Sequence, residues 1–192
     1  MVTRASCISW GGSRTGHIEI GSPANAGDIG APDRSFLAIG ARRSYGTSCL
    51  PAGDLAVTSV RMNKVISINP QSGLLRAETG ITFHEILELC IPSGWFLPVT
   101  PGTGYVTLGG AIANDVHGKN HHNAGTLGRH VTQFELLRSD GTRILCSPVE
   151  NAELFAATIG GMGLTGMMLW AEIQLMRTAP PTSTSSRSAS RT

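Results

Sequence analysis

Residues 101–131 read PGTGYVTLGGAIANDVHGKNHHNAGTLGRHV, and this stretch guides the interpretation of the whole sequence. Glycine occupies positions 102, 104, 109, 110, 118, 125 and 128, with charged and polar side chains between them. Glycine is used where the backbone takes a positive φ or approaches a ligand closely, and it weakens the interiors of helices and strands. We therefore interpret the stretch as backbone that wraps around a bound molecule.

A short helix is predicted inside this stretch, over residues 106–113 (VTLGGAIA), with Thr107 as its N-cap. We expect the first amide groups of this helix to face an anion such as a pyrophosphate. Leu108, Ile112 and Val116 recur at helical spacing. This spacing favours a packed segment over the alternative, a glycine-rich surface loop.

A metal site is a second alternative, because His117, His121 and His122 are close together in the sequence. Gly118 interrupts the spacing that would place two of these histidines on one helix face. The cysteines are distant, and Asp115 is the only nearby carboxylate. Because the pattern lacks the ligand spacing of a metal site, we expect no metal.

Composition describes a globular protein of ordinary domain size, with 192 residues and 41% hydrophobic residues. A formal charge of +2 is too small to indicate nucleic acid or an anionic membrane surface as the main partner. The four cysteines have no CxxC spacing and are expected to be buried, reduced thiols. The sequence contains no signal-peptide pattern and no apolar run of about 18 residues, so we expect a cytoplasmic protein without a transmembrane segment.

Residue patterns divide the chain into three parts: an irregular segment at 1–35, a folded domain at 36–176 and a disordered Ser/Thr-rich tail at 177–192. In the first part we expect loop with at most a short strand at 17–20. Thr82 and Glu85 form a capping-box pattern that predicts a helix ending before Pro92, and Asn151 is predicted to cap a second helix. Strands are expected at 36–39, 55–60, 65–68, 74–79, 95–99, 134–138, 143–146 and 167–176. Turn signals at Ser72-Gly73 and Asp140-Gly141 predict two hairpins among them.

Three motifs together are more specific than any one of them. They are Arg43-Ser44-Tyr45-Gly46, the segments Pro101-Gly102-Thr103 and His117-Gly118-Lys119-Asn120-His121-His122, and Gly160-Gly161-Met162-Gly163-Leu164-Thr165-Gly166. This set resembles the FAD-binding domain of the vanillyl-alcohol oxidase and p-cresol methylhydroxylase (PCMH-type) family, most closely its decaprenylphosphoryl-β-D-ribose 2′-oxidase branch. The resemblance implies an α+β domain of two small lobes, with FAD lying extended between them.

The resemblance also implies a set of cofactor-binding residues. The pyrophosphate is expected at a loop that follows the strand at 36–39 and consists of Gly40, Ala41, Arg42, Arg43, Ser44, Tyr45, Gly46 and Thr47. The path from adenine to flavin is expected along Gly102, Thr107, Leu108, Gly109 and Gly110. The flavin ring is expected near Asn114, Asp115, Val116 and His117, with Met168 meeting the cofactor from the second glycine cluster.

Two positions in the first loop differ from the family pattern. Covalent members carry a flavin-bonding histidine where this chain has Arg43, so FAD is expected to be bound non-covalently. Close relatives have glycine at the position of Arg42 and aspartate at that of Thr47. If Arg42 must take a positive φ, it adds strain on the order of 1 kcal/mol.

By resemblance, the expected activity is oxidation of a CH–OH group of a sugar or a polyprenyl-phosphate sugar, with hydride transfer to FAD. His117 and Lys119 are expected to orient or polarise the substrate, or alternatively to brace the loop, and Tyr45 either faces the substrate pocket or packs on the flavin. A substrate domain is expected to be absent after residue 176. The alternative is therefore a catalytically incomplete FAD-binding module, either a truncated paralogue or half of a split enzyme that needs a separate substrate-domain chain.

Overall fold

The structure is a computed structural model that describes residues 2–8, 12, 15–29, 35–51 and 55–178. Its largest sheet is antiparallel and has the strand order β5-β6-β10-β8-β9. The strands are β5 (Val65–Ile68), β6 (Leu74–Glu78), β8 (Val131–Leu137), β9 (Arg143–Cys146) and β10 (Met167–Gln174). The two hairpins predicted around Ser72-Gly73 and Asp140-Gly141 are confirmed, because β5 pairs with β6 and β8 with β9.

Helices pack on one face of this sheet and form the main core with it. They are α1 (Phe83–Cys90), α2 (Leu108–Ala113) and α4 (Ala152–Thr158). Phe83 of α1 and Ile112 of α2 are fully buried in the same cluster as Phe134 of β8. The Phe134 ring stacks on Phe155 of α4, with 5.1 Å between the ring centroids. The spacing of apolar residues thus builds one continuous core from elements far apart in the sequence.

The capping box predicted for α1 is confirmed. The Glu85 amide donates to the Thr82 hydroxyl at 3.2 Å, and the Thr82 amide donates to the Glu85 carboxylate at 2.7 Å. Burial alone would raise the pKa of Glu85, but hydrogen bonds from Thr82 and Asn63 outweigh it and hold the pKa below its ordinary value. The α-helix ends at Cys90, and the 3-10 turn η2 (Ile91–Ser93) contains Pro92.

Asn151 is at the N-cap position of α4, as predicted, but its side chain makes no capping hydrogen bond, so the predicted capping by the side chain is wrong. Its backbone lies in the left-handed region, with φ of 50°. The side-chain amide instead donates to the Leu145 carbonyl at 2.7 Å. Asn151 therefore ties the start of α4 to β9.

A second sheet has the order β1-β2-β4-β3 and is formed by β1 (Val2–Ile8), β2 (Thr15–Gly21), β3 (Leu37–Ile39) and β4 (Leu55–Thr58). The short strand expected at 17–20 is confirmed and extends over the length of β2, whereas the prediction of loop is wrong for β1, which forms an antiparallel pair with β2. β2 also pairs in parallel with β4. Because β4 lies far along the chain, local composition gave no sign of this pairing.

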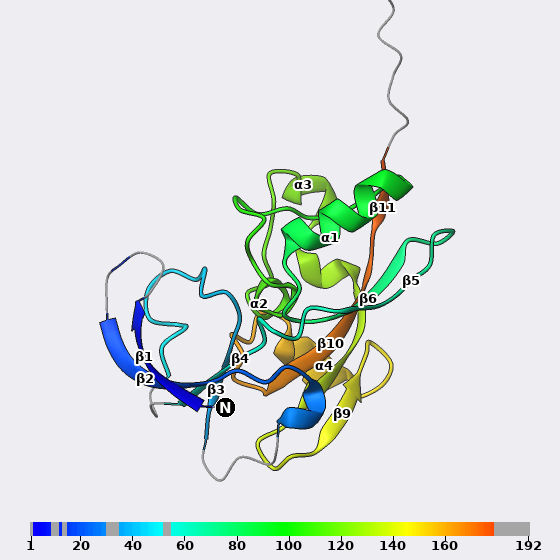
Figure 1. The fold of residues 1–192 in the computed structure, drawn as a ribbon. Helices are drawn as coiled ribbons and strands as arrows, with labels where there is room; N and C mark the ends of the chain where they lie inside the picture. Colours follow the sequence, from blue (N-terminus) through cyan, green and yellow to red (C-terminus); the bar gives the residue numbers. More distant parts are fainter. Residues whose placement is uncertain (1, 9–11, 13–14, 30–34, 52–54, 179–192) are drawn as a thin grey trace, which may run out of the picture.

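The two sheets lie side by side, with α2 near the centre of the view in Figure 1. A separate apolar cluster joins them, in which Val57 of β4 and Leu137 of β8 pack with Met62, Met167 and Leu169. The small elements α3 (His121–Ala124), η1 (Ala26–Asp28) and η3 (Leu127–His130) lie in connecting segments. The fold is therefore mixed α/β, as the sequence indicated.

Two predicted strands are shorter or divided in the structure. The strand expected at 95–99 is limited to β7 (Trp95–Phe96), and the strand expected at 167–176 ends at Gln174 before β11 (Met176–Arg177) pairs with β7. The disordered tail predicted from residue 177 is wrong for its first two residues, because Arg177 belongs to β11 and the Thr178 amide donates to the Gly94 carbonyl at 3.0 Å, and residues 179–192 lie outside the described residues. No helix in the described part of the chain has the length and apolar character needed to cross a membrane.

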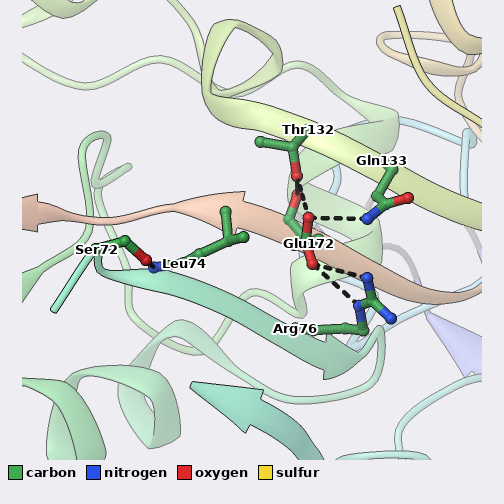
Figure 2. Close-up of polar contacts among 6 residues, drawn as sticks. All are labelled: Ser72, Leu74, Arg76, Thr132, Gln133 and Glu172. Carbon is green, nitrogen blue, oxygen red and sulfur yellow. Dashed lines mark hydrogen bonds and ion pairs between the residues drawn. The ribbon is translucent and has the colours of Figure 1, made fainter. Parts of the chain in front are cut away.

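The opposite face of the large sheet carries a charged cluster centred on Glu172 of β10 (Figure 2). The Glu172 carboxylate pairs with Arg76 at 2.9 Å and accepts hydrogen bonds from Thr132 at 2.7 Å and Gln133 at 2.9 Å. Burial alone would raise the pKa of Glu172, but these three partners together hold it below its ordinary value. The cluster thus crosses three neighbouring strands.

Burial was predicted for the cysteines, and it is confirmed for Cys49, Cys90 and Cys146. Burial raises the pKa of the Cys90 thiol. Burial also raises the pKa of Cys146, with a further contribution from Glu150. The Cys7 side chain lies outside the described part of the structure.

Candidate cofactor site

A cavity of about 410 Å³ lies where the two sheets meet. Most of its lining comes from three segments: residues within 38–45, from the end of β3 into the following loop, residues within 106–116 around α2, and residues within 162–168 that lead into β10. Ser48, Cys49, Ser59 and Thr79 complete it. The first segment belongs to the smaller sheet, and the other two belong to the core of the larger one. The cavity therefore uses both halves of the fold.

Gly40 brings the first loop against the start of α2. A Cβ atom at this position would lie 2.0 Å from the Thr107 hydroxyl oxygen, which is far inside van der Waals contact. Thr107 is itself buried and accepts a hydrogen bond from the Gly110 amide at 3.3 Å, which confirms its predicted role as N-cap. A side chain at position 40 would therefore push the loop away from α2.

The backbone is strained at and beside the cavity. Arg42 has a φ of 56° and Met162 a φ of 53°, and both residues line the cavity. Asp115, next to the lining residue Asn114, has a φ of 42°. Left-handed backbone is unfavourable for residues with a Cβ atom. Arg42 therefore has the positive φ for which backbone strain was expected.

The expectation that the first amides of α2 face an anion is wrong. The Leu108 amide donates to the Ile81 carbonyl at 2.8 Å, and the Gly109 amide donates to the Thr79 carbonyl at 2.9 Å. The Gly110 amide is used by Thr107. These groups join α2 to the end of β6 and the start of α1, so they are not available to a ligand.

Charge in the cavity has one sign. Among the described residues that line it, the only charged side chains are those of Arg42 and Arg43, and no carboxylate is present. Arg42 is exposed and Arg43 half-buried. Val106, Val116 and Met168 contribute apolar surface elsewhere on the wall. The cavity thus combines a cationic end with apolar walls.

Most of the residues predicted to bind a cofactor line this cavity. They are Gly40, Ala41, Arg42, Arg43, Ser44, Tyr45, Thr107, Gly109, Gly110, Asn114, Val116 and Met168. The remaining predicted residues, Gly46, Thr47, Gly102, Leu108, Asp115 and His117, are not part of the lining described for it. Leu108 is fully buried in the core instead.

Asp115 has a structural contact outside the cavity. Its carboxylate accepts a hydrogen bond from the Gly128 amide at 2.8 Å. This bond ties the segment after α2 to η3, and Gly128 leaves room for it because a Cβ there would lie 2.9 Å from the same carboxylate oxygen. Asp115 therefore braces the loop that continues into His117.

The candidate catalytic side chains do not converge on one point. Tyr45 lines the cavity and is 78% exposed. His117 and Lys119 are exposed beyond α2 and lie outside the described lining. The His117 ring lies 5.6 Å from that of His121, which in turn lies 6.0 Å from His122. Within the described residues, no group of three or more His, Cys, Asp or Glu side chains is arranged to hold a metal ion.

Sequence reasoning missed part of the third segment. Met162, Gly163, Gly166 and Met167 line the cavity, although only Met168 was selected from this region. The signal was the glycine cluster at 160–166, in which Gly163 has a φ of 79° and its Cβ position lies 3.0 Å from the Ala38 carbonyl. That contact joins the third segment to the first.

Comparisons with known proteins agree with this geometry. A family model described as an FAD binding domain matches residues 29–147. The chain is 40% identical over 146 residues to decaprenylphosphoryl-beta-D-ribose oxidase of Mycolicibacterium smegmatis, covering 76% of this chain and 32% of the relative. It is 28% identical over 147 residues to the delta(24)-sterol reductase of Homo sapiens, covering 74% of this chain and 28% of the relative.

A plant protein also matches: cytokinin dehydrogenase 8 of Oryza sativa subsp. indica is 34% identical over 102 residues, covering 53% of this chain and 19% of the relative. The chain therefore spans about a third or less of the length of these curated relatives. The family match includes the loop at 40–47 and helix α2, two of the three segments around the cavity. The chain belongs to the FAD-binding domain family of the PCMH type.

Proposed function

We propose that the cavity binds FAD non-covalently and that the chain is the cofactor-binding part of an oxidoreductase. The observation that carries this proposal is a cavity between two sheets whose described lining has two guanidinium groups and no carboxylate. FAD is a dianion at its pyrophosphate and has an apolar ring system, so both ends of the cavity suit it. When bound, FAD supplies the hydride acceptor that the protein lacks.

The pyrophosphate is assigned to the loop at 40–47. Arginine is suited to phosphate oxygens, since its planar guanidinium donates several hydrogen bonds in a fixed geometry. Successive backbone amide groups of a tight loop can also bind an anion, and we assign that role to this loop. Non-covalent attachment is supported by Arg43 at the position of the family's flavin-bonding histidine, and by the absence of histidine from the described lining.

The flavin ring is assigned to the apolar wall formed by Val116, Met167 and Met168. Apolar walls with few polar groups are typical of small-molecule sites. Val116 is followed directly by His117, so the loop braced by Asp115 leads from this wall to the exposed His117 and Lys119. We assign these two side chains to the orientation of a substrate at the mouth of the site, and Tyr45 to the exposed part of the cavity wall.

The proposed substrate is a sugar or a polyprenyl-phosphate sugar, oxidised at a CH–OH group. Its support is the 40% identity to a relative whose name specifies decaprenylphosphoryl-beta-D-ribose. Relatives named for a sterol and for a cytokinin match the same chain. This diversity suggests that the shared segment serves the cofactor and that substrate choice depends on other parts of those longer proteins.

The second candidate function is an FAD-binding module that does not turn over alone. Its support is the position of His117 and Lys119 outside the described lining. A separate substrate-domain chain and a cytoplasmic location remain predictions. Reduction of bound FAD by a decaprenylphosphoryl-ribose analogue, with and without a candidate substrate-domain chain, distinguishes the two functions.

FAD binding itself is tested by titrating the apoprotein with FAD and following the quenching of flavin fluorescence. Asn114 is exposed and lines the cavity, so Asn114→Trp is expected to fill part of it and to weaken binding about tenfold or more. Asn123→Trp is the matched control, because Asn123 is exposed on α3 and is not in the described lining. Equal FAD affinity in both variants would place the flavin elsewhere.

A further inference from the structure

The cationic end of the cavity contains two arginines with different backbone conformations. Arg42 is in the left-handed region, with φ of 56°, and its neighbour Arg43 is not among the described residues with positive φ. A left-handed backbone is tolerated by glycine without penalty and is unfavourable for arginine. The side chain of Arg42 must therefore contribute something that compensates for this penalty, or the position is simply suboptimal.

Met162 separates these two explanations within the same cavity. It also lines the wall and also has a left-handed backbone, with φ of 53°, but it carries no charge. Glycine at Met162 would remove strain together with an uncharged part of the wall, whereas glycine at Arg42 would remove strain together with one of the two cations in the described lining. The chain thus contains its own control for the effect of charge.

We infer that Arg42 is a second phosphate-binding cation of the site, retained in a strained loop because two guanidinium groups match the two negative charges of a dinucleotide pyrophosphate. This inference rests on the proposed binding of FAD. Arg42 precedes Arg43 in the same loop, so both side chains start from the segment assigned to the pyrophosphate. Charge-assisted bonds to phosphate are stronger than neutral ones, but the exposure of Arg42 makes its contribution sensitive to salt.

Strain and charge have separate experimental signatures. Backbone strain is present in the loop with and without ligand, so its removal changes the melting temperature of the apoprotein and leaves the dissociation constant nearly unchanged. Loss of a phosphate contact changes the dissociation constant and its dependence on salt. Arg42→Gly is therefore expected to bind FAD more weakly while its apoprotein melts at the same temperature as wild type or higher.

The test measures the dissociation constants of FAD and ADP for wild type, Arg42→Gly, Arg42→Lys and Met162→Gly by calorimetry, at about 50 mM and about 500 mM salt. Arg42→Gly is expected to weaken both ligands about fivefold at low salt and less than about twofold at high salt. Arg42→Lys is expected to recover most of the affinity at low salt. Met162→Gly removes no charge, so any change in affinity that it causes is expected to be the same at both salt concentrations.

ADP shares the two phosphates of FAD and lacks the flavin, so an equal effect on both ligands assigns Arg42 to the phosphates. An Arg42→Gly protein with wild-type affinity at low salt would overturn the inference and leave the proposed function intact. A loss that is independent of salt and shared by Met162→Gly would also overturn it, because the effect would then come from backbone conformation. Wild-type protein that binds no FAD would overturn the proposed function and the inference together.

Discussion

Gly40 shows how a single missing methyl group determines the contact between two parts of the fold. The Cβ of an alanine at this position would lie 2.0 Å from the Thr107 hydroxyl, and Thr107 is buried as the N-cap of α2. Gly40→Ala is expected to lower the free energy of unfolding by about 1–3 kcal/mol through overpacking. Urea denaturation measures this change.

Gly102→Ala is the matched control, because no atom lies within 4 Å of its Cβ position. Its free energy of unfolding should stay within about 0.5 kcal/mol of wild type. In the double variant Gly40→Ala/Thr107→Ala the clashing oxygen is gone. Its loss of unfolding free energy should therefore be smaller than the sum of the losses in the two single variants. Additive losses in the double variant would show that Gly40 does not act through Thr107.

Asp115 is a positioning residue whose role depends on one hydrogen bond. Asp115→Ala leaves the half-buried Gly128 amide without its acceptor and is expected to cost about 1–2 kcal/mol of unfolding free energy. Asp115→Asn keeps an acceptor oxygen and a residue that tolerates positive φ, so most of the stability should return. If chemical denaturation gives the same midpoint for the alanine variant and wild type, the brace between α2 and η3 is unimportant.

Individual residues were predicted well where local rules decide and poorly where distant contacts do. The positive φ at Arg42 was considered because the family pattern has glycine at that position, and the N-cap at Thr107 follows from residue type. Asp115 was assigned to the flavin by resemblance, yet its carboxylate contacts Gly128 thirteen residues later. The sequence contains no local sign of that bond.

At the scale of elements, β10 contributes side chains to the core and also carries Glu172, the centre of the charged cluster shown in Figure 2. Glu172 is buried among Arg76, Thr132 and Gln133, and its pKa is held below the ordinary value. The unfolded chain therefore takes up the proton at a higher pH than the folded chain does. The stability that Glu172 contributes is present above the ordinary glutamate pKa of about 4.3 and is lost as the pH falls through the folded-state pKa.

Glu172→Gln removes this titration and the ion pair with Arg76. Its free energy of unfolding at neutral pH is expected to fall by about 1–3 kcal/mol, with a shallower further decrease in acid than wild type shows. Glu88→Gln is the control, since its ion pair with His84 is exposed and contributes little. Parallel acid dependence in wild type and Glu172→Gln would contradict the role given to this carboxylate.

Helices and strands were predicted correctly where the residues that determine them lie close together in the sequence. The capping box of α1 and the turn signals of the two hairpins lie within a few residues, and both predictions are confirmed. β1 was missed, and β2 was predicted only as a short strand, because its full length depends on pairing with β1 and β4. The amides of α2 were misassigned for the same reason, since their acceptors are in residues 79 and 81.

At the scale of the whole molecule, the fold brings three sequence segments around one cavity. The first comes from the smaller sheet and the others from the larger sheet and its helices. The family and the first two cavity segments could be predicted from sequence motifs, and the family match includes both of these segments. In the third segment only Met168 was predicted, and Met162, Gly163, Gly166 and Met167 required the structure, because the glycine cluster indicates a loop without showing which side chains face the cavity.

The central claim is that this cavity holds non-covalent FAD, and the visible absorption spectrum of the protein tests it most directly. The purified chain is incubated with FAD, separated from free flavin and measured before and after acid precipitation. We predict flavin bands near roughly 370 and 450 nm at about one flavin per chain, with all of the flavin released into the acid supernatant. Colourless protein after this treatment would contradict the account, and flavin retained in the acid pellet would contradict non-covalent binding.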